Sequence, residues 1–179
     1  DLLNLDELRG RDMTIRKNPE VPQILIYHTH SQEGFADSVE GDDSTTIMGA
    51  GELLARILRE EYGYYVIHHT GKFDVESRDY AYSNSLPAIE QILQEYPTIE
   101  VVIDLHRDEM LEGRKLVMDL NGRPTARLMF FNGISHTKEQ GDITYLENPY
   151  IKDNLAFSFQ MQVAANEYYP GLARRIYLK

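Results

Sequence analysis

The chain contains no cysteine, and none of its apolar runs approaches the ~20 residues that a membrane-spanning helix needs. Without cysteine it can form no disulfide, no thiolate metal site and no cysteine nucleophile. It is also poor in positive charge: 18 Lys and Arg stand against 29 Asp and Glu, and the formal net charge is −11. Nucleic acid is therefore disfavoured as a partner, because phosphate binding requires clustered Lys and Arg.

No signal peptide is visible, and the first residue is Asp1 rather than Met. We therefore expect the sequence to be a segment of a longer protein. Its 179 residues, 42% of them apolar, suffice for one globular domain with a substantial core. We assign residues 1–20 to a polar lead-in segment and residues 21–179 to a single domain, because no repeat or linker interrupts them.

Apolar runs and helical periodicity alternate in the first part of the chain. The runs are typical of short buried strands and cover residues 23–27, 64–68 and 100–105. Apolar residues at helical spacing separate them, and this alternation predicts an α/β fold with crossover connections. Further on, Asn121-Gly122 predicts a hairpin, and Asn148-Pro149 predicts the start of a last helix. We predict a mixed, mostly parallel central sheet with helices on both faces.

Three histidines and a glutamate follow the first and third predicted strands. Residues 24–33 read ILIYHTHSQE, which places His28, His30 and Glu33 after the first strand, and His106 follows the third. Ligands gather at the carboxyl ends of strands in α/β sheets, and the first and third strands of such an order are often neighbours. Imidazole and carboxylate groups with one open position suit a catalytic zinc ion that activates water. We predict that His30, Glu33 and His106 bind zinc.

Neighbouring side chains receive supporting roles in this prediction. His28 either contacts the substrate or supports a ligand. Arg107 either stabilises an oxyanion, binds a substrate carboxylate or forms a surface salt bridge. Asp104 or Asp108 is expected to orient His106, because metal-binding imidazoles usually donate their second N–H to a carboxylate or carbonyl.

The remaining histidines and a group of hydroxyl side chains are weaker candidates. His68 and His69 are adjacent, so their side chains diverge along a strand, and His136 lies in a polar stretch. A structural or surface role is favoured for all three. The hydroxyl side chains either line a substrate groove or form a helix face packed on the sheet: Tyr80, Tyr82, Ser83 and Ser85.

Four segments resemble the stage II sporulation protein P family of peptidoglycan hydrolases, which is similar to the zinc-dependent N-acetylmuramoyl-L-alanine amidases. They are residues 24–33, 48–54 (MGAGELL), 103–108 (IDLHRD) and 170–174 (PGLAR). The resemblance implies an amidase-like (phosphorylase/hydrolase-like) fold with a six-stranded sheet. It implies zinc-dependent cleavage of the amide between the glycan's lactyl group and the stem peptide, with a further endopeptidase activity on cross-links. It also implies an extracytoplasmic, membrane-anchored parent protein and a lytic transglycosylase partner.

The chain departs from those amidases at two places. Their glutamate ligand begins the first helix, where this chain has residues 43–46 (DSTT); Glu33 is the nearest substitute and Glu40 the second. Their catalytic glutamate lies on a strand after the last helix. The chain ends at Lys179 before such a strand is complete, so we expect the domain to lack it.

Two other functions remain open. His30-x-x-Glu33 followed by His106 is also the ligand pattern of zinc carboxypeptidases, which would need Arg107 or Arg114 to bind the substrate's terminal carboxylate. The non-catalytic alternative is a wall-binding or scaffolding module with a vestigial metal site.

Overall fold

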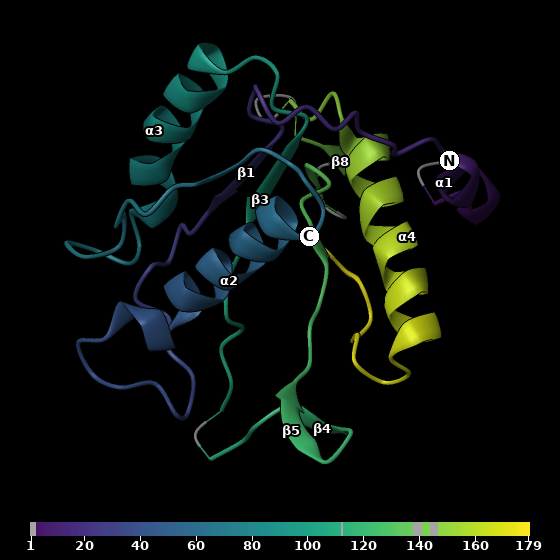
Figure 1. Ribbon diagram of the computed structural model, residues 1–179. Coiled ribbons are helices and arrows are strands. Elements are labelled where there is room, and N and C mark those ends of the chain that lie inside the picture. Colours follow the sequence, from purple (N-terminus) through teal and green to yellow (C-terminus); the bar gives the residue numbers. More distant parts are fainter. Residues whose placement is uncertain (1–2, 112, 138–140, 144–146) are drawn as a thin grey trace. The chain divides into compact units, whose positions relative to one another are not determined.

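The computed structural model describes residues 3–111, 113–137, 141–143 and 147–179 (Figure 1). The chain forms two compact units, one of residues 15–109 and the other of residues 1–14 with 110–179. All residues of the candidate site belong to residues 15–109. Among the described residues, no helix is both long and apolar enough to cross a membrane.

A three-stranded parallel sheet forms the centre of residues 15–109. Its strands are β1 (Ile24–Tyr27), β2 (Val66–His68) and β3 (Val101–Asp104), in the order β2-β1-β3. The middle strand β1 is the most deeply buried, and its Leu25 and Ile26 have no exposed surface. The three predicted strands and the predicted pairing of the first with the third are confirmed.

Two helices and a short 3₁₀ turn connect these strands: η1 (Asp43–Thr45), α2 (Ile47–Glu60) and α3 (Ala81–Glu95). Ala55 of α2 packs with Ile26 in the core, whereas Ser85 of α3 contacts Thr29. Side chains alternate between the two faces of a strand, so these contacts put the helices on opposite faces of the sheet. Right-handed crossovers produce this arrangement for the order β2-β1-β3.

The other unit combines two helices with small strand pairs. Leu8 of α1 (Leu5–Gly10) packs against Leu155 and Ala156 of α4 (Ile151–Tyr168). The pairs are β4 (Val117–Leu120) with β5 (Arg123–Ala126), β6 (Phe131–Asn132) with β9 (Tyr177–Leu178), and β7 (His136–Thr137) with β8 (Gly141–Asp142). The hairpin turn between β4 and β5 has φ angles of +54° and +81° at the Asn-Gly pair, as predicted.

The mixed α/β class is confirmed, but the central sheet differs from the prediction. In the part of the chain that the structure describes, β4 and β5 pair with each other and do not join β1, so the central sheet has three parallel strands rather than six. The surface of the hairpin explains this difference. Half or more of each strand's residues are exposed, and Pro124 cannot donate a backbone hydrogen bond from the edge of β5, which is typical of strands at or outside the edge of a sheet.

Candidate functional site

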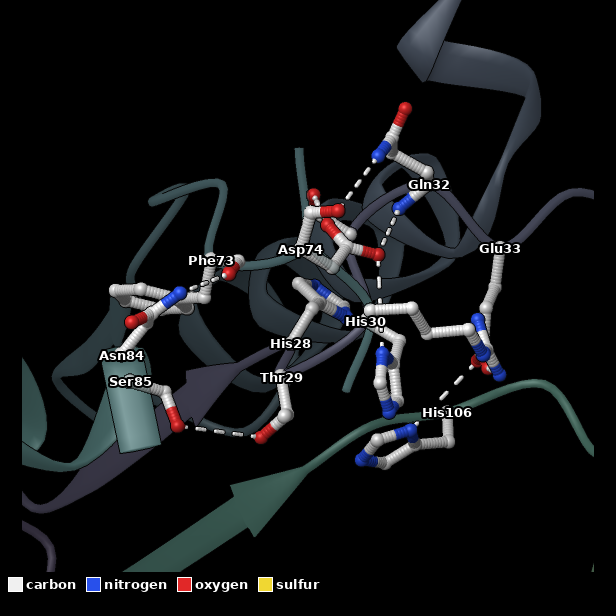
Figure 2. A network of polar contacts seen from close by, with 12 residues as sticks. His28, Thr29, His30, Gln32, Glu33, Phe73, Asp74, Asn84, Ser85 and His106 are labelled. Atoms are coloured by element: carbon white, nitrogen blue, oxygen red, sulfur yellow. Dashed lines mark hydrogen bonds and ion pairs between the residues drawn. The ribbon is translucent and has the colours of Figure 1, made fainter. Parts of the chain in front are cut away.

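The three predicted ligands meet at the carboxyl ends of β1 and β3. His30 and Glu33 lie in the loop after β1, and His106 follows β3 (Figure 2). The ring centroids of His30 and His106 are 5.4 Å apart, and Nδ1 of His106 lies 3.6 Å from Oε2 of Glu33. The parallel pairing of β1 with β3 brings these loops together although they are far apart in the sequence.

Glu33 is a buried and ionised carboxylate. Its side chain is only 4% exposed; Oε1 accepts a hydrogen bond from Nη2 of Arg78 at 3.0 Å, and Oε2 accepts one from the backbone N–H of Arg107 at 2.6 Å. Burial opposes the charge, but the neighbouring His106 and the hydrogen bonds from Arg107 and Arg78 outweigh it and lower the pKa of Glu33 to about 2. Glu33 is therefore negatively charged at any physiological pH.

Asp104 contacts His106 on the side of the ring opposite Glu33. Nε2 of His106 lies 2.8 Å from Oδ2 of Asp104, and the same carboxylate accepts hydrogen bonds from the N–H and hydroxyl of Thr29 at the end of β1. Burial disfavours a charged imidazole, but Asp104 and Glu33 raise the pKa of His106 to about 9. Of the two aspartates predicted to orient His106, Asp104 makes the contact.

His30 carries a buried ring nitrogen that lacks a hydrogen bond. Its Nδ1 has no partner among the described residues, and Oδ2 of Asp74 lies 3.8 Å away. Figure 2 shows the His30 ring between Asp74 and His106. Asp74 is itself buried and accepts a hydrogen bond of 2.6 Å from the hydroxyl of Ser31. Burial and the charge of Arg78 lower the pKa of His30, which favours the neutral ring that a metal ion requires.

Tyr82 covers the two site histidines. Its ring stacks on His106 with a centroid distance of 6.2 Å and meets His30 edge-on at 5.4 Å, yet the residue is 61% exposed. Tyr80 is exposed as well, whereas Ser85 is buried against the sheet. Of the two roles predicted for this segment, groove lining fits Tyr82, which borders the site, and helix packing fits Ser85, which faces the sheet.

His28 belongs to a second histidine pair with complete hydrogen bonding. Its ring has no exposed surface; Nδ1 donates to the carbonyl of Leu105 at 2.8 Å, and Nε2 lies 2.9 Å from Nε2 of His68, whose Nδ1 is 2.8 Å from Glu52. Gly51 makes room for this pair, because a Cβ there would collide with both rings. A ring without exposed surface offers nothing to a substrate, so the supporting role predicted for His28 is favoured over substrate contact.

The side chain of Arg107 donates its hydrogen bonds to main-chain carbonyls. Its Nε donates to the carbonyl of Gly34 at 2.9 Å, and its Nη1 donates to the carbonyl of Asp108 at 3.1 Å. These bonds tie the loops after β1 and β3 together. The arginine whose guanidinium reaches Glu33 is instead Arg78, which the sequence did not single out.

The other candidate residues lie away from this cluster or outside the part of the chain that the structure describes. Glu40 is exposed in the loop after β1, and Glu33 is the carboxylate beside the histidines. Arg114 belongs to the other unit. His69 stacks on Phe73 at 5.6 Å, so its side chain diverges from that of His68, as predicted. The side chain of His136 lies outside the described part of the structure.

The site offers zinc-type donors that are not assembled around an ion. Among the described residues, no three His, Cys, Asp or Glu side chains stand in an arrangement that could hold a metal ion. The donor chemistry nevertheless fits zinc, because the His30 ring lies beside that of His106, and His106 turns Nδ1 toward the Glu33 carboxylate. Metal binding would remove the proton on His106 and would replace hydrogen bonds that Glu33 now accepts.

Fold and site together define the class: an α/β protein with a histidine–carboxylate site at the carboxyl edge of a parallel sheet. The model of one protein family, stage II sporulation protein P, matches residues 6–179, and the chain belongs to this family. Membership gives the chain a sporulation-related role that acts on peptidoglycan, and the family is linked generally to peptidoglycan hydrolysis. Comparisons with curated proteins and with solved structures found no match.

Proposed function

We propose that the chain is a zinc-dependent N-acetylmuramoyl-L-alanine amidase that cleaves the amide between the glycan's lactyl group and the stem peptide, with a further endopeptidase activity on cross-links. Family membership supports peptidoglycan as the substrate. The observation that carries the proposal is the meeting of His30, Glu33 and His106 at one edge of the sheet. This donor set supports metal-assisted hydrolysis of an amide.

His30, Glu33 and His106 would hold the zinc ion, which in such sites supplies an activated water and polarises the carbonyl of the scissile amide. Asp104 engages Nε2 of His106 and leaves Nδ1 for the metal. Asp74, 3.8 Å from Nδ1 of His30, stands where it can accept that N–H and leave Nε2 for the metal. Carboxylates behind metal-bound histidines fix the ring and strengthen it as a ligand.

Other groups prepare the site for this chemistry. His106 carries a proton at neutral pH because its pKa is raised to about 9, and a metal ion must displace that proton. Tyr82 packs against both ligand rings and excludes water from that side. His28 holds the carbonyl of Leu105 and thereby fixes the backbone next to His106.

The proposed setting is outside the cytoplasm, in a membrane-anchored parent protein that works with a lytic transglycosylase. The two activities are complementary, because one removes stem peptides and the other cuts glycan strands. With a net charge of −11, the chain has no general attraction to an anionic wall. Local contacts or the partner enzyme must therefore bring it to its substrate.

Analysis of the products from purified peptidoglycan tests the proposal. The zinc-loaded chain should generate glycan strands with free lactyl ends and release intact stem peptides. Release of single terminal amino acids would identify a zinc carboxypeptidase instead. A chain that shows no zinc by elemental analysis and no wall lysis would be the non-catalytic wall-binding module. The ion pair of Glu33 with Arg78 favours that alternative, because the pair occupies a carboxylate that zinc would need.

A further inference from the structure

An exposed cation lies at the edge of the site. The side chain of Arg78 is 58% exposed, and its Nη2 donates to Oε1 of Glu33 at 3.0 Å. Arg107, which also contacts Glu33, has its side chain bound to the carbonyls of Gly34 and Asp108. Arg78 therefore combines contact with the site and access from solvent.

The guanidinium of Arg78 has hydrogen-bonding capacity beyond its contact with Glu33. An arginine carries five N–H donors in a planar fork that matches a carboxylate. The ion pair with Glu33 engages one terminal nitrogen, and the exposed remainder can receive a second carboxylate. The exposed ring of Tyr82, four residues further along, packs against His30 and His106 and offers an apolar surface at the same site.

The charges around the site make such a cation necessary for an anionic ligand. The chain has a net charge of −11, and the carboxylates of Glu33 and Asp104, which accept hydrogen bonds from the backbone N–H groups of Arg107 and Thr29, lie within the site. These groups repel an approaching carboxylate over distances of about one Debye length, ~8 Å at physiological salt. Arg78, 3.0 Å from Glu33, opposes that repulsion directly beside the proposed reaction centre.

We propose that Arg78 binds a free carboxylate of the stem peptide close to the cleaved amide, while Tyr82 packs against the adjoining part of the substrate. The identity of that amide rests on the proposed function. The proposal narrows the substrate class to peptides that carry a free carboxylate near the scissile bond. Peptides in which this carboxyl is amidated are poor ligands.

Direct binding measurements test this assignment. The probes are two short stem peptides that differ only in a free carboxyl or a carboxamide on the residue after the first alanine, titrated into the whole chain with and without zinc. The wild type should prefer the free acid by about tenfold or more, the usual value of a charge-assisted bidentate contact. Arg78→Gln should remove the preference, and Arg78→Lys should retain part of it, because lysine keeps the charge without the fork.

Lys72→Gln is the matched control, because Lys72 forms another exposed ion pair, with Asp43, and its loss should leave the preference intact. Equal affinities for acid and amide in the wild type would overturn the proposal. Equal losses for both peptides in Arg78→Gln would also overturn it and would assign Arg78 to the support of Glu33. Because binding is measured without turnover, a chain that selects the acid through Arg78 but never cleaves the wall would overturn the amidase function alone.

Discussion

Two histidine pairs in residues 15–109 differ in how completely they are hydrogen bonded. In the pair of His28 and His68, each ring nitrogen has a partner, and both rings are buried. In the pair of His30 and His106, Nδ1 of His30 lacks a partner among the described residues, and the His106 side chain is 27% exposed. Buried polar groups in proteins are normally satisfied. The first pair is therefore typical of structural support, and the second is typical of a ligand site.

Of all the changes to these two pairs, removal of a zinc ligand should have the largest effect. His30→Ala and His106→Ala should each abolish zinc binding, with a loss of at least about 100-fold in affinity, because each deletes one of three ligands. Zinc titration of the chelator-treated chain and elemental analysis after dialysis measure this loss. His69→Ala is the control, since His69 stacks on Phe73 outside the cluster and its loss should leave zinc binding unchanged. Full zinc occupancy in either ligand variant would remove that residue from the ligand set.

Removing His28 should affect folding more than zinc binding. His28→Ala leaves the carbonyl of Leu105 and Nε2 of His68 without these hydrogen bonds and opens a cavity beside Gly51 of α2. The free energy of unfolding should fall by about 2–4 kcal/mol. Denaturant unfolding in chelator measures this change, and zinc affinity at low temperature should fall by less than about tenfold, because His28 reaches His106 only through the backbone of Leu105. Intact stability with lost zinc binding would instead place His28 among the ligands.

The sequence predicted the elements that depend on short-range patterns. The apolar run of β1 and the strand–helix alternation led to the parallel pairing of β1 with β3, which brings His30 and His106 together. Asn121-Gly122 predicted its hairpin because both positions require positive φ. These features follow from local periodicity and turn chemistry. Whether the hairpin joins the central sheet does not follow from local patterns, and the prediction that it does was wrong.

The missed site residues share a different property. Arg78 and Asp74 lie in the irregular loop between β2 and α3, which has neither periodicity nor a motif, and their partners are 40 or more residues away in the sequence. His68, at the end of β2, was considered without its partner His28, because the contact depends on the register between β2 and β1. Nothing in a polar loop's sequence shows which strand end it folds against. Tertiary packing decides that, and single-sequence patterns do not contain it.

Weakening the support of a ligand should have a smaller effect than removing the ligand. Asp104→Asn preserves the shape of the side chain but removes the charge that orients His106, so zinc affinity should fall by about 10–100-fold. Asp74→Asn should lower it toward the small end of that range, because its 3.8 Å separation from His30 is longer. Glu40→Gln is the control, because Glu40 is exposed in the loop after β1, and it should change affinity by less than about threefold. An equal loss in Glu40→Gln would show that a general loss of negative charge, and not the support of a ligand ring, lowers the affinity.

The smallest expected effect is the response of the two pairs to pH in the metal-free chain. Asp104 and Glu33 raise the pKa of His106 to about 9, so its contribution to stability is fully present below pH ~6.5 and is lost as the pH rises through 9. The stability difference between the wild type and His106→Gln should therefore shrink by about 1–2 kcal/mol between pH 6.5 and 9.5. Denaturant unfolding at both values measures it, and a constant difference would mean that these carboxylates do not hold a charged ring. For His28 the sign reverses, because burial lowers its pKa and its contribution is lost as the pH falls below ~6.5.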